Sequence, residues 1–443
     1  MTTDDEIQEN SQKYQSLRGF HDVLPDEYDY YTLVKKTARH RLRQAGFRRI
    51  STPIMEETAL FVRAAGETTD IVEKEMFTMQ SRSGKSMSLK PESTAGIVRA
   101  YIEHGMMNLP QPVQLYAIEP HFRYDRPQKG RYRQFHQLDF EVIGTRDASI
   151  DAQVILISYK FLKDLKILHH FSLQLNTLGN AESRKQFNDD LRNYFFGKER
   201  YLSEDLLSKL EKNPIRILDA KDEDVQILLS KAPKLGDYLD AASKEYYAEV
   251  KGFLDELGIS YRENKNLVRG LDYYSDTVFE FWDKNEGAQN AVGGGGRYDG
   301  LVEFLGGRPT PAVGVAFGLE RIVQHMKDEG IVPPQKDKIP VFVAQLGGEA
   351  KKKAMRILAE LHDKGIHAVG AVGKASIKYQ LEMANKVNAD WAVLMGEVEV
   401  REKKAILRDM NAGTQEIVEI DEVVKKVLEL VGSENLDVYT LGE

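Results

Sequence analysis

The chain has 443 residues, a formal net charge of −8 and no cysteine. Its length allows two or three domains with a sizeable hydrophobic core. The lack of cysteine excludes disulfides, thiolate nucleophiles and Cys-based zinc sites. The acidic balance argues against unspecific coating of nucleic acid, although it leaves room for a local basic site.

The N-terminal segment, residues 1–16, is acidic and polar and resembles neither a signal peptide nor a transit peptide. We expect it to be disordered. No uninterrupted apolar run of the sequence approaches the ~20 residues of a membrane span, so no membrane association is expected. With the absence of cysteine, this composition suits a reducing cytoplasm.

The next part of the chain shows a helical pattern and then a strand-like one. Apolar and aromatic residues recur at helical spacing over residues 26–45, with a plausible glycine cap directly after them. The run "FRRISTPI" that follows reads as a strand ending at a proline. Further on, the side chain of Ser93 or Thr94 can cap a helix that extends to about His104.

Residues 113–144 hold two strand-like runs separated by "RPQKG", which suits a long hairpin. Around its tip, five basic residues face the single acid Asp125: Arg123, Arg126, Lys129, Arg131 and Arg133. Arginine donates paired hydrogen bonds to phosphate, and Tyr132 and Phe135 can stack on a base. The alternative is a solvated charged hairpin. Gln137 and Glu141 share parity and therefore one face of the second strand.

The stretch "LVRGLDYYSDTVFEF", residues 267–281, is strand-like but irregular in its middle. Strict alternation would place Arg269 and Tyr274 on opposite faces. If both serve one site, Gly270 must break the strand there. A glycine bulge followed by an edge strand with a solvated arginine is an equally good interpretation of this stretch alone.

Three other segments carry weaker signals. "LKPESTAG" places Glu92 and Thr94 at a predicted helix start, where an acidic residue is often only a first-turn charge. "GGGGRYDG" permits close approach of the backbone to a ligand but is equally typical of a loop. In "GVAFGLERI", Arg321 falls in the first turn of a helix, where a positive charge is disfavoured and hints at an anionic ligand.

The order of segments predicts the domain organisation. Residues 180–263 have charged, helical periodicity and indicate an inserted helical module, after which strand-like patterns return. Residues 333–338 lie in the proline-containing segment "VPPQKDKIP" and form the predicted linker. Residues 339–443 alternate strands and helices and predict a separate α/β domain.

In this order, the motifs resemble those of the class II aminoacyl-tRNA synthetases and, within them, the histidyl-tRNA synthetases. "GFRRISTPIMEETALF" resembles the dimer motif, the Arg123 hairpin the second class motif and "GVAFGLERI" the third. "LVRGLDYY" and "GGGRYDGL" resemble the two histidine-specific signatures. The resemblance implies an α+β catalytic domain over residues 17–332, built on an antiparallel sheet flanked by helices, and an anticodon-binding domain over residues 339–443.

The resemblance also implies site residues. Those matching histidine contacts are Glu92, Ser93, Thr94, Gln137, Glu141, Tyr273, Tyr274 and Tyr298. Those matching ATP contacts are Arg123, Asp125, Tyr132, Phe135 and Arg321. Arg269 matches an arginine beside the α-phosphate and, with Arg123 and Arg321, is expected to be catalytic. Arg126, Gln128 and Lys129 are expected to meet the tRNA acceptor end.

The implied partners are ATP, L-histidine, histidine tRNA and a second copy of the chain in a homodimer. Mg²⁺ is expected with ATP, with no metal ligand identified in the protein, no zinc and no organic cofactor. The chain departs from many bacterial relatives at Lys90, Ser93, Tyr124 and Asp125. The main alternative is a non-catalytic paralogue that senses histidine and regulates histidine biosynthesis. Such a paralogue typically lacks the C-terminal domain, whereas here all three arginines and that domain are present.

Overall fold

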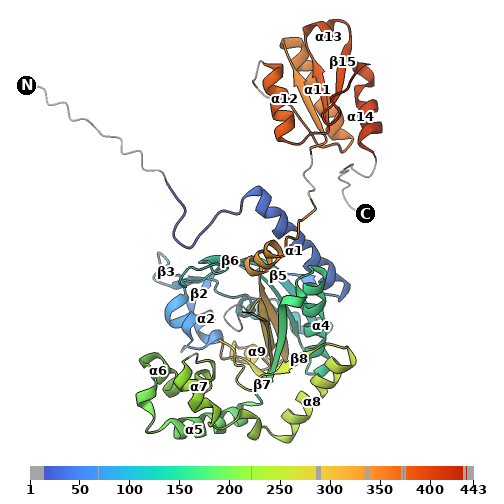
Figure 1. The fold of residues 1–443 in the computed structure, drawn as a ribbon. Helices are drawn as coiled ribbons and strands as arrows, with labels where there is room; N and C mark the ends of the chain where they lie inside the picture. The colour runs from blue at the N-terminus through green and yellow to red at the C-terminus, as the bar shows by residue number, and fades with distance from the viewer. Residues whose placement is uncertain are drawn as a thin grey trace, which may run out of the picture. The chain divides into compact units, whose positions relative to one another are not determined.

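The computed structural model describes residues 14–432 and 436, apart from residues 68, 221, 286–290, 335–338, 371–372 and 374–375. Two compact units are separated between Pro333 and Pro334 (Figure 1). Most of the N-terminal segment expected to be disordered (1–13) and most of the expected linker (335–338) lie outside the described residues. No helix in the described part of the chain is long and apolar enough to cross a membrane.

A sheet of eight strands forms the centre of the first unit, in the order β1-β5-β6-β11-β10-β9-β7-β8. The strands are β1 (Arg48–Arg49), β5 (Val113–Phe122), β6 (Gln134–Ile143), β7 (Phe171–Thr177), β8 (Tyr261–Glu263), β9 (Ser275–Asp283), β10 (Gly293–Arg297) and β11 (Ala312–Gly318). Every neighbouring pair is antiparallel except β1–β5 and β7–β8 at the two edges. The expected antiparallel sheet is confirmed, with parallel strands added at its edges. The expected strand in "FRRISTPI" is reduced to the two residues of β1.

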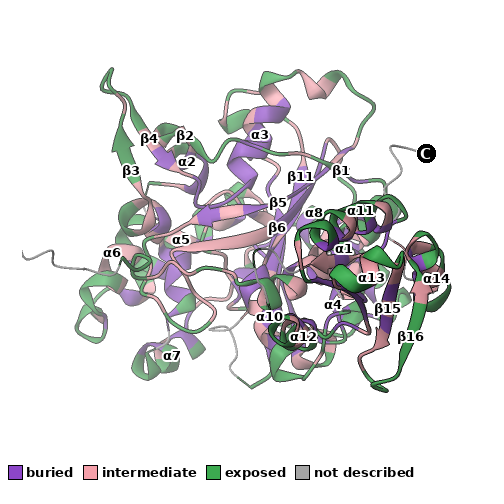
Figure 2. Ribbon diagram, turned by 90° about the horizontal axis from the view of Figure 1, so that it is seen from above, coloured by how far each residue is buried: buried purple, intermediate pink, exposed green. Residues whose placement is uncertain are grey.

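Helices cover one face of this sheet and enclose the larger core. They are α1 (Pro25–Gln44), α4 (Ala148–Asp164), α8 (Ala241–Glu256) and α10 (Leu319–Asp328). The predicted helical spacing on α1 is confirmed, because Val34, Ala38 and Leu42 recur every four residues and are all buried. In Figure 2 the central strands β5, β6 and β11 are buried or half-buried, whereas many helices carry exposed residues on part of their surface.

The other face carries the remaining helices and a second core. They are α2 (Thr58–Ala65), α3 (Thr94–Glu103), α5 (Ala181–Phe195), α6 (Glu204–Lys212), α7 (Glu223–Ser230) and the short α9 (Leu301–Phe304), with a π-helical turn at Ile71–Glu75. A small sheet joins β2 (Met55–Glu57), β4 (Ser86–Leu89) and β3 (Thr78–Gln80) beside them. The segment expected as a helical insertion, 180–263, does contain four helices, but α8 packs on α4 and β8 joins the main sheet beside β7.

The four glycines of "GGGGRYDG" form a central strand, β10, so the loop alternative is wrong. A Cβ on Gly295 would lie 2.0 Å from the carbonyl oxygen of Gly314, and one on Gly296 would lie 2.4 Å from that of Thr277. Glycine therefore lets β11 and β9 approach β10 from both sides.

The second unit is an α/β domain with a five-stranded sheet in the order β13-β12-β14-β15-β16. Its strands are β12 (Val341–Gln345), β13 (Ala368–Gly370), β14 (Trp391–Met395), β15 (Lys404–Asp409) and β16 (Gln415–Glu419). Its helices are α11 (Gly348–Asp363), α12 (Ile377–Lys386), α13 (Glu397–Arg401) and α14 (Val423–Val431). Alternate residues of β12 enter two separate cores, Val341 and Val343 in one and Phe342 and Ala344 in the other. Because both faces of β12 are buried, the residues from Val341 to Ala344 are all apolar.

Candidate active site

Glu141 occupies the centre of a cluster of buried polar side chains on the main sheet, which we call the pocket. It lies on β6, and its carboxylate accepts hydrogen bonds from the hydroxyl of Thr94 at 2.8 Å and from that of Tyr298. The neighbouring strand β11 places Gly314 beneath it, where a Cβ would lie 1.4 Å from Glu141 Oε2. Residue 314 must therefore be a glycine, because a larger side chain would collide with the Glu141 carboxylate.

Glu92 caps helix α3 at the edge of the same pocket. Its carboxylate accepts hydrogen bonds from the backbone N–H of Thr94 at 2.7 Å and of Ala95 at 3.0 Å. The expected cap through the side chain of Ser93 or Thr94 is therefore wrong. The Ser93 hydroxyl instead lies 2.8 Å from both His121 Nε2 and Asp139 Oδ2.

Burial shifts the carboxyl groups of this pocket toward their neutral forms. It raises the pKa of Glu141 to about 8, against the opposing effect of the hydroxyl bonds from Tyr298 and Thr94. It likewise raises the pKa of Asp139 to about 8 and the pKa of Glu92 above its usual value. Burial and the cations of Lys90 and Arg123 hold the pKa of His121 well below its usual range. The pocket therefore favours a ligand that brings positive charge or N–H donors.

Three tyrosines and a glutamine complete the pocket. The ring of Tyr273 lies 4.6 Å from that of Tyr274 and 5.5 Å from that of Tyr298. Tyr274 and Tyr298 are buried, at 6% and 1% exposed, and Tyr273 is partly buried beside them. Gln137 Oε1, on the same strand as Glu141, is buried without a hydrogen-bond partner among the described residues. An orphaned polar atom of this kind indicates a place where a ligand binds.

Arg269 approaches these residues from a loop, as the lack of alternation in "VRGLDYY" allowed. Strand β9 begins only at Ser275. The Arg269 guanidinium pairs with Glu280 of β9, donates to the carbonyl of Gly294 at 3.3 Å and lies 5.4 Å from the Tyr274 ring centroid. A Cβ on Gly294 would lie 2.7 Å from Arg269 Nη1, so this glycine makes room for the arginine.

The inserted helices determine the path of that loop. Asp272 Oδ1 accepts hydrogen bonds from the Arg216 guanidinium at 2.8 and 3.0 Å and from Asn213 at 2.7 Å. Arg216 also donates to the carbonyl of Gly270 at 3.1 Å. Gly270 does not adopt a positive φ, and a Cβ there would meet no described atom within 4 Å. The chain bends at Gly270 and Leu271 as expected, but neither a positive φ nor a close contact requires glycine there, and the pairing of Asp272 holds the turn.

Positive charge gathers at the other end of the site. Arg321 lies in the first turn of α10 as expected, and its guanidinium donates to the carbonyl of Ala291. Burial and the nearby cations of Arg131 and Arg123 lower the pKa of Arg321 to about 10. Arg123 donates to the carbonyl of Pro91 at 2.9 Å and lies 5.4 Å from the ring centroid of Phe135. Partly buried arginines that repel one another favour an anionic ligand between them.

The hairpin tip between β5 and β6 is more open. Asp125 pairs with Arg131 at 3.4 Å, and the ring of Tyr132 stacks 4.1 Å from that of His21. The three residues expected at the tRNA acceptor end are all exposed there: Arg126, Gln128 and Lys129.

Comparison with known proteins decides the family. A family model described as histidyl-tRNA synthetase matches residues 19–322, and one described as an anticodon-binding domain matches residues 340–430. A histidine–tRNA ligase of Dehalococcoides mccartyi is 44% identical over 414 residues, which cover 94% of this chain and 99% of the relative. The chain belongs to the histidyl-tRNA synthetase family.

Solved structures agree with this membership. The apo histidyl-tRNA synthetase of Staphylococcus aureus is 33% identical, with a TM-score of 0.78 over 94% of this chain and 99% of that one. A Bacillus halodurans protein described as an ATP phosphoribosyltransferase regulatory subunit/histidyl-tRNA synthetase is 19% identical, with a TM-score of 0.61 over 85% of this chain and 97% of that one. The similarity to the Bacillus halodurans protein shows only that the two chains share a fold.

The structure adds residues that the sequence motifs of a histidyl-tRNA synthetase did not single out. Glu280 pairs with Arg269, and Glu320 accepts hydrogen bonds from the backbone N–H of His136 at 2.8 and 3.0 Å. Asp139 and His121 lie on either side of Ser93. The sequence shows Glu280 as the polar residue of the alternating run "TVFEF", but only the fold reveals that it pairs with Arg269.

Proposed function

We propose that the pocket between α3, β6 and α10 carries both chemical steps of a histidine–tRNA ligase. In the first step the carboxylate of histidine attacks the α-phosphorus of ATP, forming histidyl-adenylate and releasing pyrophosphate. In the second step a hydroxyl at the 3′ end of histidine tRNA attacks the acyl carbon, and AMP leaves. Neither step needs a side-chain nucleophile, which is consistent with a chain that has no cysteine.

The carboxyl-lined end of the pocket takes histidine in this proposal. Glu141 and Tyr274 address the two imidazole nitrogens, with Tyr273 and Tyr298 lining the ring. Glu92, Thr94 and Gln137 address the α-ammonium group. Ser93 supports them, because its hydroxyl is already held by His121 and Asp139. The orphaned Gln137 Oε1 and the buried Glu141 support this assignment.

The arginine-lined end takes ATP. Arg123 and Arg321 clamp the phosphates, while Phe135, Tyr132 and Asp125 contact the nucleotide. Arg269 stabilises the charge that develops at the α-phosphate. Such preorganised cations lower the barrier to phosphoryl and adenylyl transfer by electrostatic stabilisation. Mg²⁺ enters with ATP as part of the substrate.

The macromolecular partners follow from the surface residues. Arg126, Gln128 and Lys129 meet the acceptor end of the tRNA, and the second unit, from Pro334 onward, binds the anticodon.

A homodimer is part of the proposal. Its support is that Ile54 and Met55, in the dimer motif, are exposed apolar side chains, beside a cavity of about 860 Å³ that is lined by Ile50, Thr52 and Arg99 among others. A cytoplasmic location, where ATP and tRNA are both available, is also part of the proposal.

The observation that carries the proposal is the polarity of the site, with buried carboxyls at one end and mutually repelling arginines at the other. Histidine-dependent ATP–pyrophosphate exchange tests it directly. The expected result is exchange that requires histidine and is not supported by other amino acids. A protein that bound histidine but catalysed no exchange would instead be a histidine-sensing regulator.

A further inference from the structure

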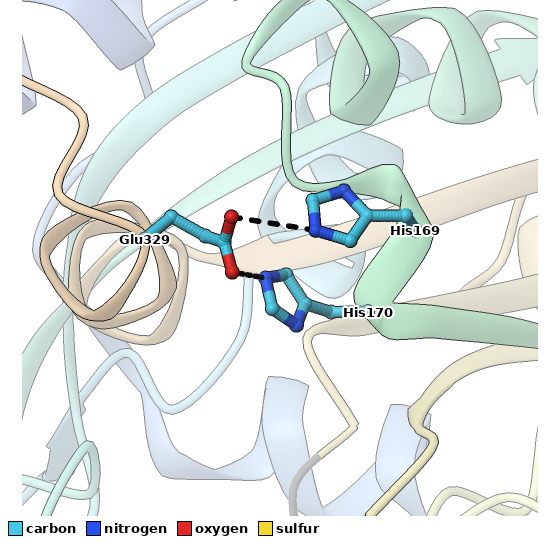
Figure 3. Close-up of side chains that lie close together, drawn as sticks. All are labelled: His169, His170 and Glu329. Atoms are coloured by element: carbon cyan, nitrogen blue, oxygen red, sulfur yellow. Dashed lines mark ion pairs between the residues drawn. The ribbon is translucent and has the colours of Figure 1, made fainter.

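Two histidines and a glutamate meet at a point that the proposed reaction does not use. His169 and His170 belong to the short turn before β7, and Glu329 follows the last residue of α10 (Figure 3). The Glu329 carboxylate lies 3.4 Å from His169 Nε2 and 2.7 Å from His170 Nε2. Among the described residues, this is the only group of three such side chains whose possible ligand atoms all lie within 4.8 Å of one another.

A positive charge near Glu329 would be energetically favourable. It is the C-cap residue of α10, where the helix carbonyls make a second negative charge unfavourable. The two imidazole rings face this carboxylate side by side, with centroids 4.2 Å apart. The possible ligand atoms of all three side chains lie within 4.8 Å of one another, so they can address a single shared cation.

His170 Nε2 is inaccessible to solvent and lies 2.7 Å from the Glu329 carboxylate, with which it makes no well-aligned hydrogen bond. A metal ion held between these two groups would accept the lone pair of the nitrogen and so satisfy this buried atom.

We propose that His169, His170 and Glu329 bind one Zn²⁺ ion, with water as the fourth ligand. Imidazole nitrogen and carboxylate oxygen are zinc ligands at 2.0–2.2 Å, which in a tetrahedron places ligand atoms roughly 3.3–3.5 Å apart. The distance from His169 Nε2 to Glu329 matches this spacing, and a small rotation of the carboxylate opens the shorter one. Mg²⁺ prefers oxygen ligands and is excluded by the two imidazoles.

The ion joins two elements that are distant in sequence. It ties the C-terminal end of α10 to the turn before β7, while the first turn of α10 carries Arg321. Two charged neighbours of the cluster have partners of their own. Lys284 Nζ donates to the carbonyl of His169 at 2.7 Å, and His325 pairs with Asp283 at 3.6 Å. The family resemblance implies no zinc in the reaction, so the ion stabilises the fold rather than taking part in catalysis.

Calorimetric titration of the untagged, chelator-treated full-length protein with Zn²⁺ alone tests the proposal. We expect one ion per chain, binding that survives millimolar Mg²⁺, and a rise in the midpoint of thermal unfolding. His169→Ala and Glu329→Gln should each weaken binding by at least roughly 10–100-fold, the loss typical when even an outer-shell partner is removed.

His40→Ala is the matched control, because His40 is an exposed histidine on α1 outside the cluster. It should bind Zn²⁺ as the unaltered chain does. Co²⁺ in place of Zn²⁺ should give the visible spectrum of a four-coordinate ion only when the three side chains are intact. The proposal is overturned if the unaltered chain binds no Zn²⁺, if Mg²⁺ displaces it, or if both cluster variants bind as tightly as the control.

Discussion

Glu141 is the residue on which amino-acid selection should depend. It is 1% exposed and held by two hydroxyl donors, so an analogue without a ring N–H would leave it with an unpaired buried group. Sites of this kind discriminate by about 10⁴-fold or more without a separate editing step. We therefore expect this protein to have no hydrolytic editing activity.

The substitution Glu141→Gln tests that assignment. It should raise the KM for histidine sharply and leave the KM for ATP nearly unchanged, because the ATP phosphates are proposed to lie at the arginine-lined end. Steady-state pyrophosphate exchange at varied histidine and ATP gives both values. Glu103→Gln, an exposed acid on α3, is the control. An equal loss for both substrates would contradict the assignment.

Arg269 is expected to act on the transition state rather than on binding. Arg269→His should lower the turnover of adenylate formation by on the order of 10²–10³-fold, as for loss of one oxyanion donor, with modest changes in KM. Arg269→Lys should recover only part of the activity, because lysine lacks the planar fork that also pairs with Glu280. Arg262→His, at an exposed arginine on β8, serves as the control. Near-normal turnover in Arg269→His would make this residue a structural partner of Glu280.

The hydrogen bonds around Ser93 indicate which neighbour carries a proton. If His121 Nδ1–H donates to the carbonyl of Glu119, 3.1 Å away, then His121 Nε2 must accept a proton from Ser93. The single hydroxyl proton of Ser93 cannot then also serve Asp139. Because burial raises the pKa of Asp139 to about 8, we expect Asp139 rather than Ser93 to supply the proton of their hydrogen bond at neutral pH.

This protonation predicts a pH dependence of stability. Unfolded Asp139 loses its proton near pH 4 and the folded form near pH 8, so the free energy of unfolding falls as pH rises between these values. Asp139→Asn removes this fall in the free energy of unfolding, because asparagine does not titrate. Relative to the unaltered chain, the variant should gain at least about 1 kcal/mol between pH 5 and pH 8. Urea unfolding across this range measures the difference, and a difference that does not change with pH would show that Asp139 is ionised in the folded protein. The charged groups around it, Glu92, Lys90 and Glu119, are the same in both proteins.

At the scale of elements, the glycines of β10 and β11 hold the site open. Gly314→Ala would place a methyl group within 1.4 Å of Glu141 Oε2, so the carboxylate must move. We expect the KM for histidine to rise as it does in Glu141→Gln, with the fold retained by circular dichroism. Gly270→Ala is the matched comparison, because its Cβ meets no described atom within 4 Å, and it should change the KM little. A larger rise in the KM for histidine in Gly270→Ala than in Gly314→Ala would instead show that Gly270 shapes the loop.

At the scale of the whole molecule, we propose that the first unit activates histidine and that the second contributes to tRNA selection. The residues assigned to adenylate formation all precede Pro333, and the second unit has its own two cores. Deleting residues 338–443 should spare histidine-dependent pyrophosphate exchange and severely reduce charging of histidine tRNA. Sedimentation must show whether the shortened chain still dimerises, because loss of a dimer would reduce exchange as well. Charging as efficient as that of the full chain would rule out an anticodon-binding role.

The sequence by itself determined the local pieces whose physics is local. The spacing of Val34, Ala38 and Leu42 predicted α1, and turn residues between two alternating runs predicted the β5–β6 hairpin. The order of the motifs indicated the family. Glu141, Arg269 and Arg321 were named as site residues from that resemblance, and their roles remain predictions.

Only the tertiary structure decided how the site is assembled, because its supporting contacts join residues far apart in the chain. The loop before β9 turns because Asp272 pairs with Arg216, 56 positions away. Four glycines form a strand because β9 and β11 approach from both sides, which no local propensity encodes. The neutral state of Asp139 likewise depends on burial, a property of the folded chain that no residue carries alone.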